Sequence, residues 1–339
     1  MVNSTFLLMQ SKQEISKFFN MKILYFFEEK NTLMDKWQRH HIFDELKKHD
    51  IVVEVFNPLD FEDLVVANQK LLKKLKESDF DLFMTPHNED KLFIPTLKSI
   101  KALSVPTLLI CFDNLVIPFK YKKVCKLFDL VWLTQIETKY LFERWGANTL
   151  FLPYAANPFL FGPGDEVEEN INKVCFVGTP YGSRVNMLTS LISNDIEMDL
   201  FSNATDSTFI MESSSNIFSY VQPFLNLIRF SYGRRIILGA IKQKFFTENT
   251  LLPSSDLIEF HKPVPLDELG RVYSSYALCL SSTAARNTGV LNKPLNIINL
   301  RSFEIPMSGG LQICPYSKEI ASYFEEGKEI VFYRSKSEL

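Results

Sequence analysis

Residues 299–333 read NLRSFEIPMSGGLQICPYSKEIASYFEEGKEIVFY, and this stretch shows the pattern on which the fold rests. It predicts a helix near NLRSFEIPMSG, a strand at LQIC, a second helix at KEIASYFEEG and a closing strand at EIVFY. Helices that alternate with short β-rich strands are typical of βαβ units, in which the strands of one sheet run parallel. The end of the chain is therefore expected to belong to a parallel α/β sheet.

The same alternation extends upstream to Met21, in two series separated by a segment rich in proline and glycine. The strands of the first series are KILYFF, IVVEVF, DLFMT, PTLLICF, DLVWLT and TLFLP. Those of the second series, before residue 299, are KVCFVG, IEMDLF, LIEF and YALCLSS. Two consecutive parallel sheets predict an α/β protein of two Rossmann-like domains that face a cleft, with ligands at the carboxyl ends of the strands.

A chain of 339 residues is long enough for two such domains. The boundary is expected where Pro153, Pro158 and Pro163 cluster with two glycines before an acidic run. We therefore predict an N-terminal extension over residues 1–20, a first domain over 21–155 and a second over 156–339. The second domain is expected to contain an inserted segment at 203–255.

Composition excludes several classes of protein. The net charge of −3 provides no broad basic face, which argues against nucleic acid as a partner. The five cysteines are scattered without a C-x-x-C spacing, so they are expected to be buried thiols in a reducing compartment. No apolar run reaches the ~18 residues of a spanning helix, and residues 1–20 lack the pattern of a signal peptide. We expect a cytoplasmic protein.

The stretch 299–333 also carries a specific resemblance. Its motif residues are Arg301, Phe303, Glu304, Gly309, Gly310, Glu319, Phe324, Gly327, Lys328 and Glu329. In this order they resemble the C-terminal donor domain of CgeB-type glycosyltransferases, a family common in bacterial surface-polysaccharide gene sets. Three more stretches match, at 152–161, 175–184 and 261–275, and the resemblance is weaker over 21–150. It implies the GT-B fold and transfer of a sugar from a nucleoside diphosphate donor.

The resemblance implies roles for residues near this motif. Glu304 is expected to accept hydrogen bonds from both ribose hydroxyls of the donor, because a carboxylate offers two oxygens to adjacent donors. Arg301 is a candidate for the diphosphate, and Gly309 and Gly310 belong to the same donor-binding motif. Many retaining relatives have a second glutamate, which contacts the sugar, where this chain has Asn296. The stereochemical outcome therefore stays open.

The loop that begins Gly178-Thr179 and ends at Arg184 is a second candidate for the donor. A glycine-rich turn from strand to helix allows backbone N–H groups to approach an anion at the positive end of the helix. Arg184 adds a charged donor that could stabilise the leaving diphosphate, so we assign it a catalytic role. The alternative is an ordinary turn followed by a surface arginine.

Further candidates lie at other strand ends. His261 and Lys262 end the strand LIEF, where GT-B enzymes make backbone contacts to the nucleobase. In the first domain, His87 and Asp113 follow two strands that face the expected cleft. An inverting enzyme needs a general base there, and a desolvated aspartate is adequate. The alternatives are a capping role for Asp113 and a turn position for His87.

We predict no metal and no cofactor beyond the donor itself. His40 and His41 have no carboxylate pair at metal-ligand spacing. GT-B enzymes generally hold the diphosphate without a metal.

Residues 213–247 combine basic, aromatic and aliphatic side chains without any Asp or Glu. Such a mixture fits peripheral contact with an anionic membrane at the inner face of the cell, and an ordinary packed helical insertion is the alternative.

The preferred function is therefore glycosyl transfer from a nucleotide-sugar donor to a surface glycan, a lipid-linked glycan or a protein hydroxyl. Two alternatives keep the fold. One is a nucleotide-sugar epimerase, and the other is a non-catalytic protein that binds sugar or nucleotide.

Overall fold

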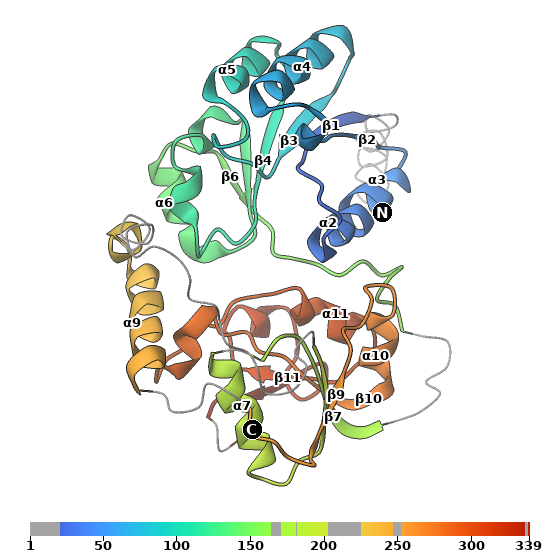
Figure 1. Ribbon diagram of the computed structural model, residues 1–339, viewed down its shortest axis with the longest axis vertical. Helices are drawn as coiled ribbons and strands as arrows, with labels where there is room; N and C mark the ends of the chain where they lie inside the picture. Colours follow the sequence, from blue (N-terminus) through green and yellow to red (C-terminus); the bar gives the residue numbers. More distant parts are fainter. Residues whose placement is uncertain (1–20, 164–170, 181, 203–224, 247–251, 336–337) are drawn as a thin grey trace, which may run out of the picture. The chain divides into compact units, whose positions relative to one another are not determined.

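The computed structural model of the chain describes residues 21–163, 171–180, 182–202, 225–246, 252–335 and 338–339. The predicted extension over residues 1–20 and much of the predicted insertion lie outside these ranges. The chain divides into two compact units, Met1–Pro153 and Tyr154–Leu339, and each contains one six-stranded parallel sheet (Figure 1). The predicted α/β class and the two parallel sheets are confirmed.

The sheet of the N-terminal unit has the strand order β2-β1-β3-β4-β5-β6. Its strands are β1 Lys22–Phe26, β2 Val52–Phe56, β3 Leu82–Thr85, β4 Thr107–Cys111, β5 Leu130–Leu133 and β6 Thr149–Phe151. The α-helices between them are α2 Leu33–Gln38, α3 Glu45–Lys47, α4 Leu64–Glu77, α5 Ile94–Ala102 and α6 Lys139–Arg144.

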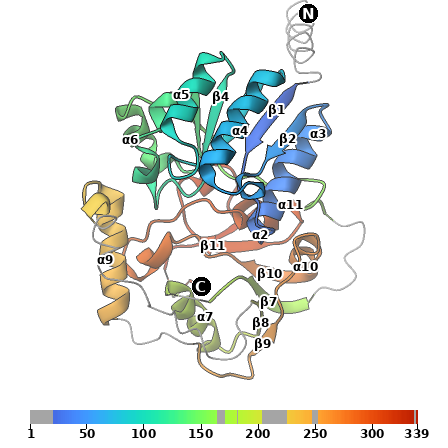
Figure 2. The same cartoon turned by 45° about the horizontal axis from the view of Figure 1, so that its top comes forward.

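Both faces of this sheet are covered, which explains why its strands are nearly continuous apolar runs. Leu24 and Phe26 of β1 pack with the buried side chains of α4 and α5, whereas Ile23 and Tyr25 pack on the opposite face with Phe43. The two views show α4 and α5 together on one side of the sheet and α2 and α3 on the other (Figures 1 and 2).

The sheet of the C-terminal unit has the order β12-β11-β10-β7-β8-β9. Its strands are β7 Ile171–Val177, β8 Met198–Phe201, β9 Ile258–His261, β10 Tyr276–Leu280, β11 Gln312–Pro315 and β12 Val331–Tyr333. The helices are α7 Ser183–Ile192, α9 Ser231–Phe246, α10 Leu269–Ser275 and α11 Arg301–Met307, with 3-10 turns η6 Arg286–Val290 and η7 Ile320–Ser322. Val174 and Phe176 of β7 pack against Leu188 and Leu191 of α7.

One sequence prediction needs correction. The helix predicted at KEIASYFEEG is only the turn η7. Ile320, Ala321 and Phe324 contact the core, but most other side chains of the run are exposed and add no packing that would stabilise a longer helix. In the N-terminal unit, a π-helical segment, Arg39–Asp44, joins α2 to α3.

The prediction that the cysteines are buried thiols is confirmed. All five cysteines are free and buried. Among the helices of the described residues, none has both the length and the apolar character that crossing a bilayer requires.

Candidate functional site

In each sheet there is one pair of neighbouring strands from which the chain continues toward opposite edges of the sheet. Ligands of open α/β sheets bind at such a point, outside the carboxyl ends of the strands. In the C-terminal unit this point lies between β7 and β10, because β8 lies on one side of β7 and β11 lies beyond β10. In the N-terminal unit it lies between β1 and β3. Each point is described within its own unit.

Two arginines from different helices meet at Gly178, the residue that follows β7. A Cβ atom at Gly178 would lie 3.0 Å from Nη2 of Arg301 and 3.8 Å from Nη1 of Arg184. Gly178 has a φ of +140°, a backbone conformation that residues with a side chain rarely adopt. The fold therefore brings Gly178, Arg184 and Arg301 together, although Arg301 is far from the other two in the sequence.

Backbone contacts in the loop differ from the expected pattern. The N–H of Gly178 donates to the carbonyl of Phe201 at 2.9 Å, so this amide is occupied by the sheet and is not turned to an anion. Nη1 of Arg184 donates to the carbonyl of Thr179 at 3.1 Å, which fixes the side chain across the loop. The φ of Gly178 favours glycine, and a Cβ here would also require the guanidinium of Arg301 to shift by a few tenths of an ångström.

The guanidinium of Arg301 lies in an interior setting. Its Nε is buried without a hydrogen-bond partner among the described residues. Its charge opposes the rise in the pKa of Tyr273 that burial causes, so the two groups are close. A buried donor without an acceptor costs about 1–3 kcal/mol, and a bound anion would supply the acceptor. Arg184 and Arg301 together are therefore suited to a phosphate group.

A cavity of about 730 Å³ lies in the C-terminal unit. Ser183 at the start of α7, Ser282 and Ala284 after β10, and Tyr316 after β11 line it, so it opens at the carboxyl ends of the strands. Its size is within the range of small-molecule sites, about 300–1,000 Å³. Arg334 also lines it, stacked over the ring of Tyr316 at 4.6 Å and held by two hydrogen bonds to Glu326.

Asn296 lines this cavity, as its predicted contact with the sugar requires. Its Nδ2 donates to the carbonyl of Tyr316 at 2.9 Å, which fixes the orientation of the amide. Its Oδ1 is buried and has no partner among the described residues. An acceptor of this kind suits a sugar hydroxyl.

Glu304 lies on α11 one turn after Arg301, and its side chain is 4% exposed. Glu304 is therefore not a solvated residue on the outer side of the helix. Its charge contributes to the raised pKa of the buried Tyr273, so the carboxylate lies on the inner side of α11.

The structure gives Gly309 and Gly310 roles in the fold. Gly309 ends α11 at a φ of +80°, and a Cβ at Gly310 would lie 2.6 Å from the backbone oxygen of Tyr273. Both requirements explain the glycines without a ligand.

His261 and Lys262 are not among the residues that line the cavity. The carbonyl of His261 accepts from the N–H of Ser202 at 3.1 Å, and its ring stacks on Phe201. The side chain of Lys262 is exposed. Their predicted backbone interaction with a nucleobase stays a prediction.

His261 does belong to a cluster that the sequence did not reveal. Ligand atoms of Asp199, Glu259 and His261 lie within 4.8 Å of one another, which a metal ion could use. However, Nζ of Lys173 already bonds the two carboxylates, at 3.0 Å to Asp199 and 2.9 Å to Glu259. An ammonium group therefore occupies the place of a cation between them.

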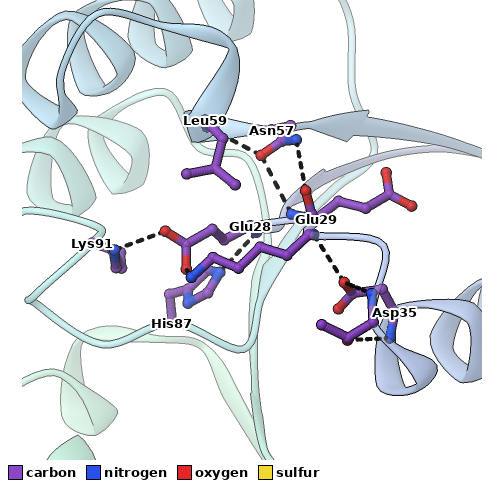
Figure 3. Close-up of polar contacts among 9 residues, drawn as sticks. Glu28, Glu29, Asp35, Asn57, Leu59, His87 and Lys91 are labelled. Atoms are coloured by element: carbon purple, nitrogen blue, oxygen red, sulfur yellow. Dashed lines mark hydrogen bonds and ion pairs between the residues drawn. The ribbon is translucent and has the colours of Figure 1, made fainter.

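In the N-terminal unit, Glu28 after β1 and His87 after β3 meet at the change of direction (Figure 3). Nε2 of His87 accepts from the backbone N–H of Glu28 at 3.0 Å. The carboxylate of Glu28 binds Lys91 at 2.7 Å and Lys30 at 2.9 Å. Burial opposes its ionisation, but the hydrogen bonds and charges of Lys91 and Lys30 keep the pKa of Glu28 below its ordinary value.

Through the contact with the backbone N–H of Glu28, His87 positions the loop that follows β1. Burial is the main reason that the pKa of His87 falls from 6.5 to about 4, so the ring is neutral near pH 7. Its Nε2 lone pair is used by Glu28, and its catalytic role stays a prediction.

Asp113 adopts a φ of +52° in the turn after β4, and its carbonyl accepts from the N–H of Val116 at 3.0 Å. Within its unit the side chain of Asp113 is exposed. A carboxylate that acts as a general base needs a raised pKa, and burial is what raises the pKa of a carboxyl group. The neighbouring Asn114 is fully buried and joins the ends of β4 and β5 through Gln135 and Thr138. The site role of Asp113 stays a prediction.

Sequence reasoning missed several polar residues at strand ends. The hydroxyls of Ser281 and Thr283, directly after β10, are buried without partners among the described residues. A Cβ at Gly289 would lie 2.3 Å from Oγ of Ser183, so the turn η6 closes tightly on the start of α7. The polar run after the strand YALCL was a usable signal for Ser281 and Thr283. Nothing in the sequence indicates that Gly289 lies against Ser183.

Comparisons with known proteins agree with this architecture. A family model described as "Glycosyl transferase-like" matches residues 226–339, which include α9, α11 and most of the cavity. A search of curated protein sequences finds no match.

Two solved structures are similar in fold. One is HepE from Anabaena in complex with UDP and glucose, with a TM-score of 0.50 and 12% identity over 93% of this chain and 86% of that one. The other is an alpha-glucosyltransferase in complex with UDP-glucose and DNA containing an abasic site, with a TM-score of 0.50 and 11% identity over 87% of this chain and 79% of that one. With two parallel six-stranded sheets in consecutive units, the chain has the two-domain Rossmann-like fold of GT-B glycosyltransferases.

Proposed function

We propose that this protein is a glycosyltransferase whose C-terminal unit binds a nucleoside diphosphate sugar. The observation that carries the proposal is the approach of Arg184 and Arg301 to Gly178 at the change of direction between β7 and β10. Two guanidinium groups at this point suit a diphosphate, and the cavity lined by Asn296 and by Ser183, the residue before Arg184, has room for a sugar. The match of residues 226–339 to a glycosyl transferase-like family supports the same function.

In this proposal the arginines act when the bond between the sugar and the diphosphate breaks. Negative charge then builds on the leaving diphosphate, and fixed positive groups beside it lower the free energy of the transition state. Glu304 would accept hydrogen bonds from the ribose, and Oδ1 of Asn296 would accept one from a sugar hydroxyl. Asp113 would serve the acceptor hydroxyl in an inverting reaction.

Several finer points belong to the proposal. The stretch 299–333 favours a CgeB-type enzyme of surface-polysaccharide synthesis, with a glycan, a lipid-linked glycan or a protein hydroxyl as acceptor. We also propose that the donor is held by arginines without a metal, so that transfer survives EDTA.

The first experiment screens UDP, GDP, CDP and dTDP for thermal stabilisation of the full chain, followed by the corresponding nucleotide sugars. We expect one diphosphate to bind and Glu304→Gln to weaken it by about 1.5–3 kcal/mol, because a charged hydrogen-bond acceptor for the ribose is lost. Glutamine keeps the size of the buried side chain, so the fold is expected to survive. Unchanged affinity in a folded Glu304→Gln variant would remove the ribose role.

The alternatives predict different products. An epimerase would convert the nucleotide sugar without an acceptor, and a non-catalytic protein would leave it intact. A protein that binds free sugar and ignores every nucleoside diphosphate would overturn the proposal.

A further inference from the structure

Helix α9 and the residues before it present one face to solvent at the edge of the C-terminal unit (Figures 1 and 2). We call this the α9 surface. It consists of the exposed apolar side chains Leu225, Ile228, Leu238, Ile241 and Phe245 and the exposed basic side chains Arg229, Arg234 and Lys244.

The inner side of α9 is firmly held by the unit. Ile236 is buried, and α9 packs along the turn η6. Arg235 donates a hydrogen bond to the carbonyl of Lys293. A Cβ at Gly233 would lie 2.0 Å from the carbonyl oxygen of Leu227, so the preceding turn folds tightly onto the helix. The orientation of α9 within the unit, and therefore of its outer side, is fixed by these contacts.

The outer side carries an apolar stripe. Leu238, Ile241 and Phe245 are 55%, 43% and 68% exposed. Together with Arg234 they follow one another at intervals of four, three and four residues, so at 3.6 residues per turn they fall within an arc of about 60°. Large apolar side chains exposed in a continuous stripe mark an interaction surface.

The charge of the segment has one sign. Residues 225–246 contain Arg229, Arg234, Arg235, Lys242 and Lys244 and no Asp or Glu, although the whole chain has a net charge of −3. Lys244 lies beside the apolar stripe, with Nζ 5.6 Å from the centre of the Phe245 ring. The partner of this surface therefore has to combine negative charge with an apolar interior.

We infer that the α9 surface binds an anionic lipid bilayer, with the stripe inserted at the level of the headgroups and the basic side chains against lipid phosphates. A second copy of the chain fits poorly, because a symmetric contact would place these cations against the same cations. Lys242 of α9 lines the cavity, so membrane contact and the cavity share one helix. The inference does not depend on the proposed function, because lipid binding is measured without a donor.

The test is cosedimentation of the full chain with vesicles of equal parts phosphatidylglycerol and phosphatidylcholine, compared with vesicles of phosphatidylcholine alone. We expect binding to the anionic vesicles that falls steeply with salt, since screening acts within a Debye length of about 10 Å. Each basic residue near such a surface contributes about a fivefold factor, so Arg234→Glu with Lys244→Glu should lower the partition coefficient at least ~25-fold. Leu238→Gln with Ile241→Gln and Phe245→Gln should also abolish binding.

The matched control is Lys318→Glu with Lys328→Glu, which makes the same change in net charge at exposed positions of the same unit. The control should bind anionic vesicles like the wild type, and all variants should keep the wild-type melting temperature. Wild-type protein that ignores anionic vesicles at low salt would overturn the inference, as would an equal loss in the control. Self-association in solution that Leu238→Gln with Ile241→Gln and Phe245→Gln abolishes would instead assign the surface to a second copy.

Discussion

At the scale of single residues, His87 and Glu28 are joined by a hydrogen bond at the carboxyl ends of strands β1 and β3. The neutral ring of His87 accepts from the backbone of Glu28, and the carboxylate of Glu28 is bound by Lys91 and Lys30. Protonation of His87 would remove the acceptor and bury a charge. The stability of this unit should therefore depend on pH.

The sign follows from the two pKa values of His87, about 4 in the folded chain and 6.5 as the ordinary value. Between them the unfolded chain binds a proton that the folded chain does not, so stability is lost as the pH falls from 6.5 towards 4. The loss is about 1.4 kcal/mol per pH unit for this group. Burial likewise lowers the pKa of His41 to about 4, which adds a contribution of the same sign.

His87→Gln keeps an acceptor for the N–H of Glu28 and removes the titration. We expect this variant to lose less stability than the wild type between pH 6.5 and pH 4, measured by urea denaturation. His49→Gln is the control, because His49 is exposed in the same unit. Equal pH dependence in wild type and His87→Gln would show that His87 is not buried as a neutral ring.

Gly178 shows how far sequence reasoning reaches for one residue. Its place in a loop between strand and helix was predictable from KVCFVGTPYGSR. The close approach of Arg301 to Gly178 was not predictable, because Arg301 lies on another helix. The candidate set therefore contained Gly178, Arg184 and Arg301, which lie together in the structure, before their contacts could be known.

At the scale of elements, the motif residues at α11 fall into two groups, those within the helix and those that follow its end. Arg301 and Glu304 lie in its first turn and in the interior, whereas Gly309 and Gly310 follow its end. The N–H of Gly309 donates to the carbonyl of Pro306 and that of Gly310 to Ile305, which closes the helix. The motif thus combines ligand candidates with the means of ending the helix.

Gly309→Ala should therefore destabilise the fold by about 1–2 kcal/mol, since a left-handed conformation is costly for residues with a Cβ. Asparagine tolerates this conformation, so Gly309→Asn should be milder. Both variants should bind nucleoside diphosphate like the wild type, as measured by calorimetry below their melting temperatures. Weakened binding in a Gly309→Ala variant of normal stability would restore a donor contact at this position.

Elements differed in how well the sequence predicted them. The strands were predictable because both sheet faces are covered and their apolar runs are short and continuous. The run 318–327 was predicted as a helix because its residues favour one locally, but only Ile320–Ser322 form a turn. Tertiary packing, which the sequence does not show, decides such cases.

At the scale of the whole molecule, the order of elements predicted two parallel sheets. It did not predict the strand orders, which differ between the units and place one change of direction beside Gly178 and the other between Glu28 and His87. The predicted insertion contains α9 between β8 and β9. The sequence does not show which side of α9 faces outward; this follows from the packing of α9 against η6.

The central claim is that the C-terminal unit binds the diphosphate of a nucleotide sugar through Arg184 and Arg301. The most direct measurement is calorimetric titration of UDP, GDP, CDP and dTDP, and of the matching nucleoside, into wild type and Arg184→Ala with Arg301→Ala. Arg271→Ala, at an exposed position of α10, is the control. Each charged hydrogen bond is worth about 1.5–3 kcal/mol, so the double variant should lose at least about 100-fold in affinity for the diphosphate and little for the nucleoside. Equal losses for both ligands, or full diphosphate affinity in the folded double variant, would contradict the account.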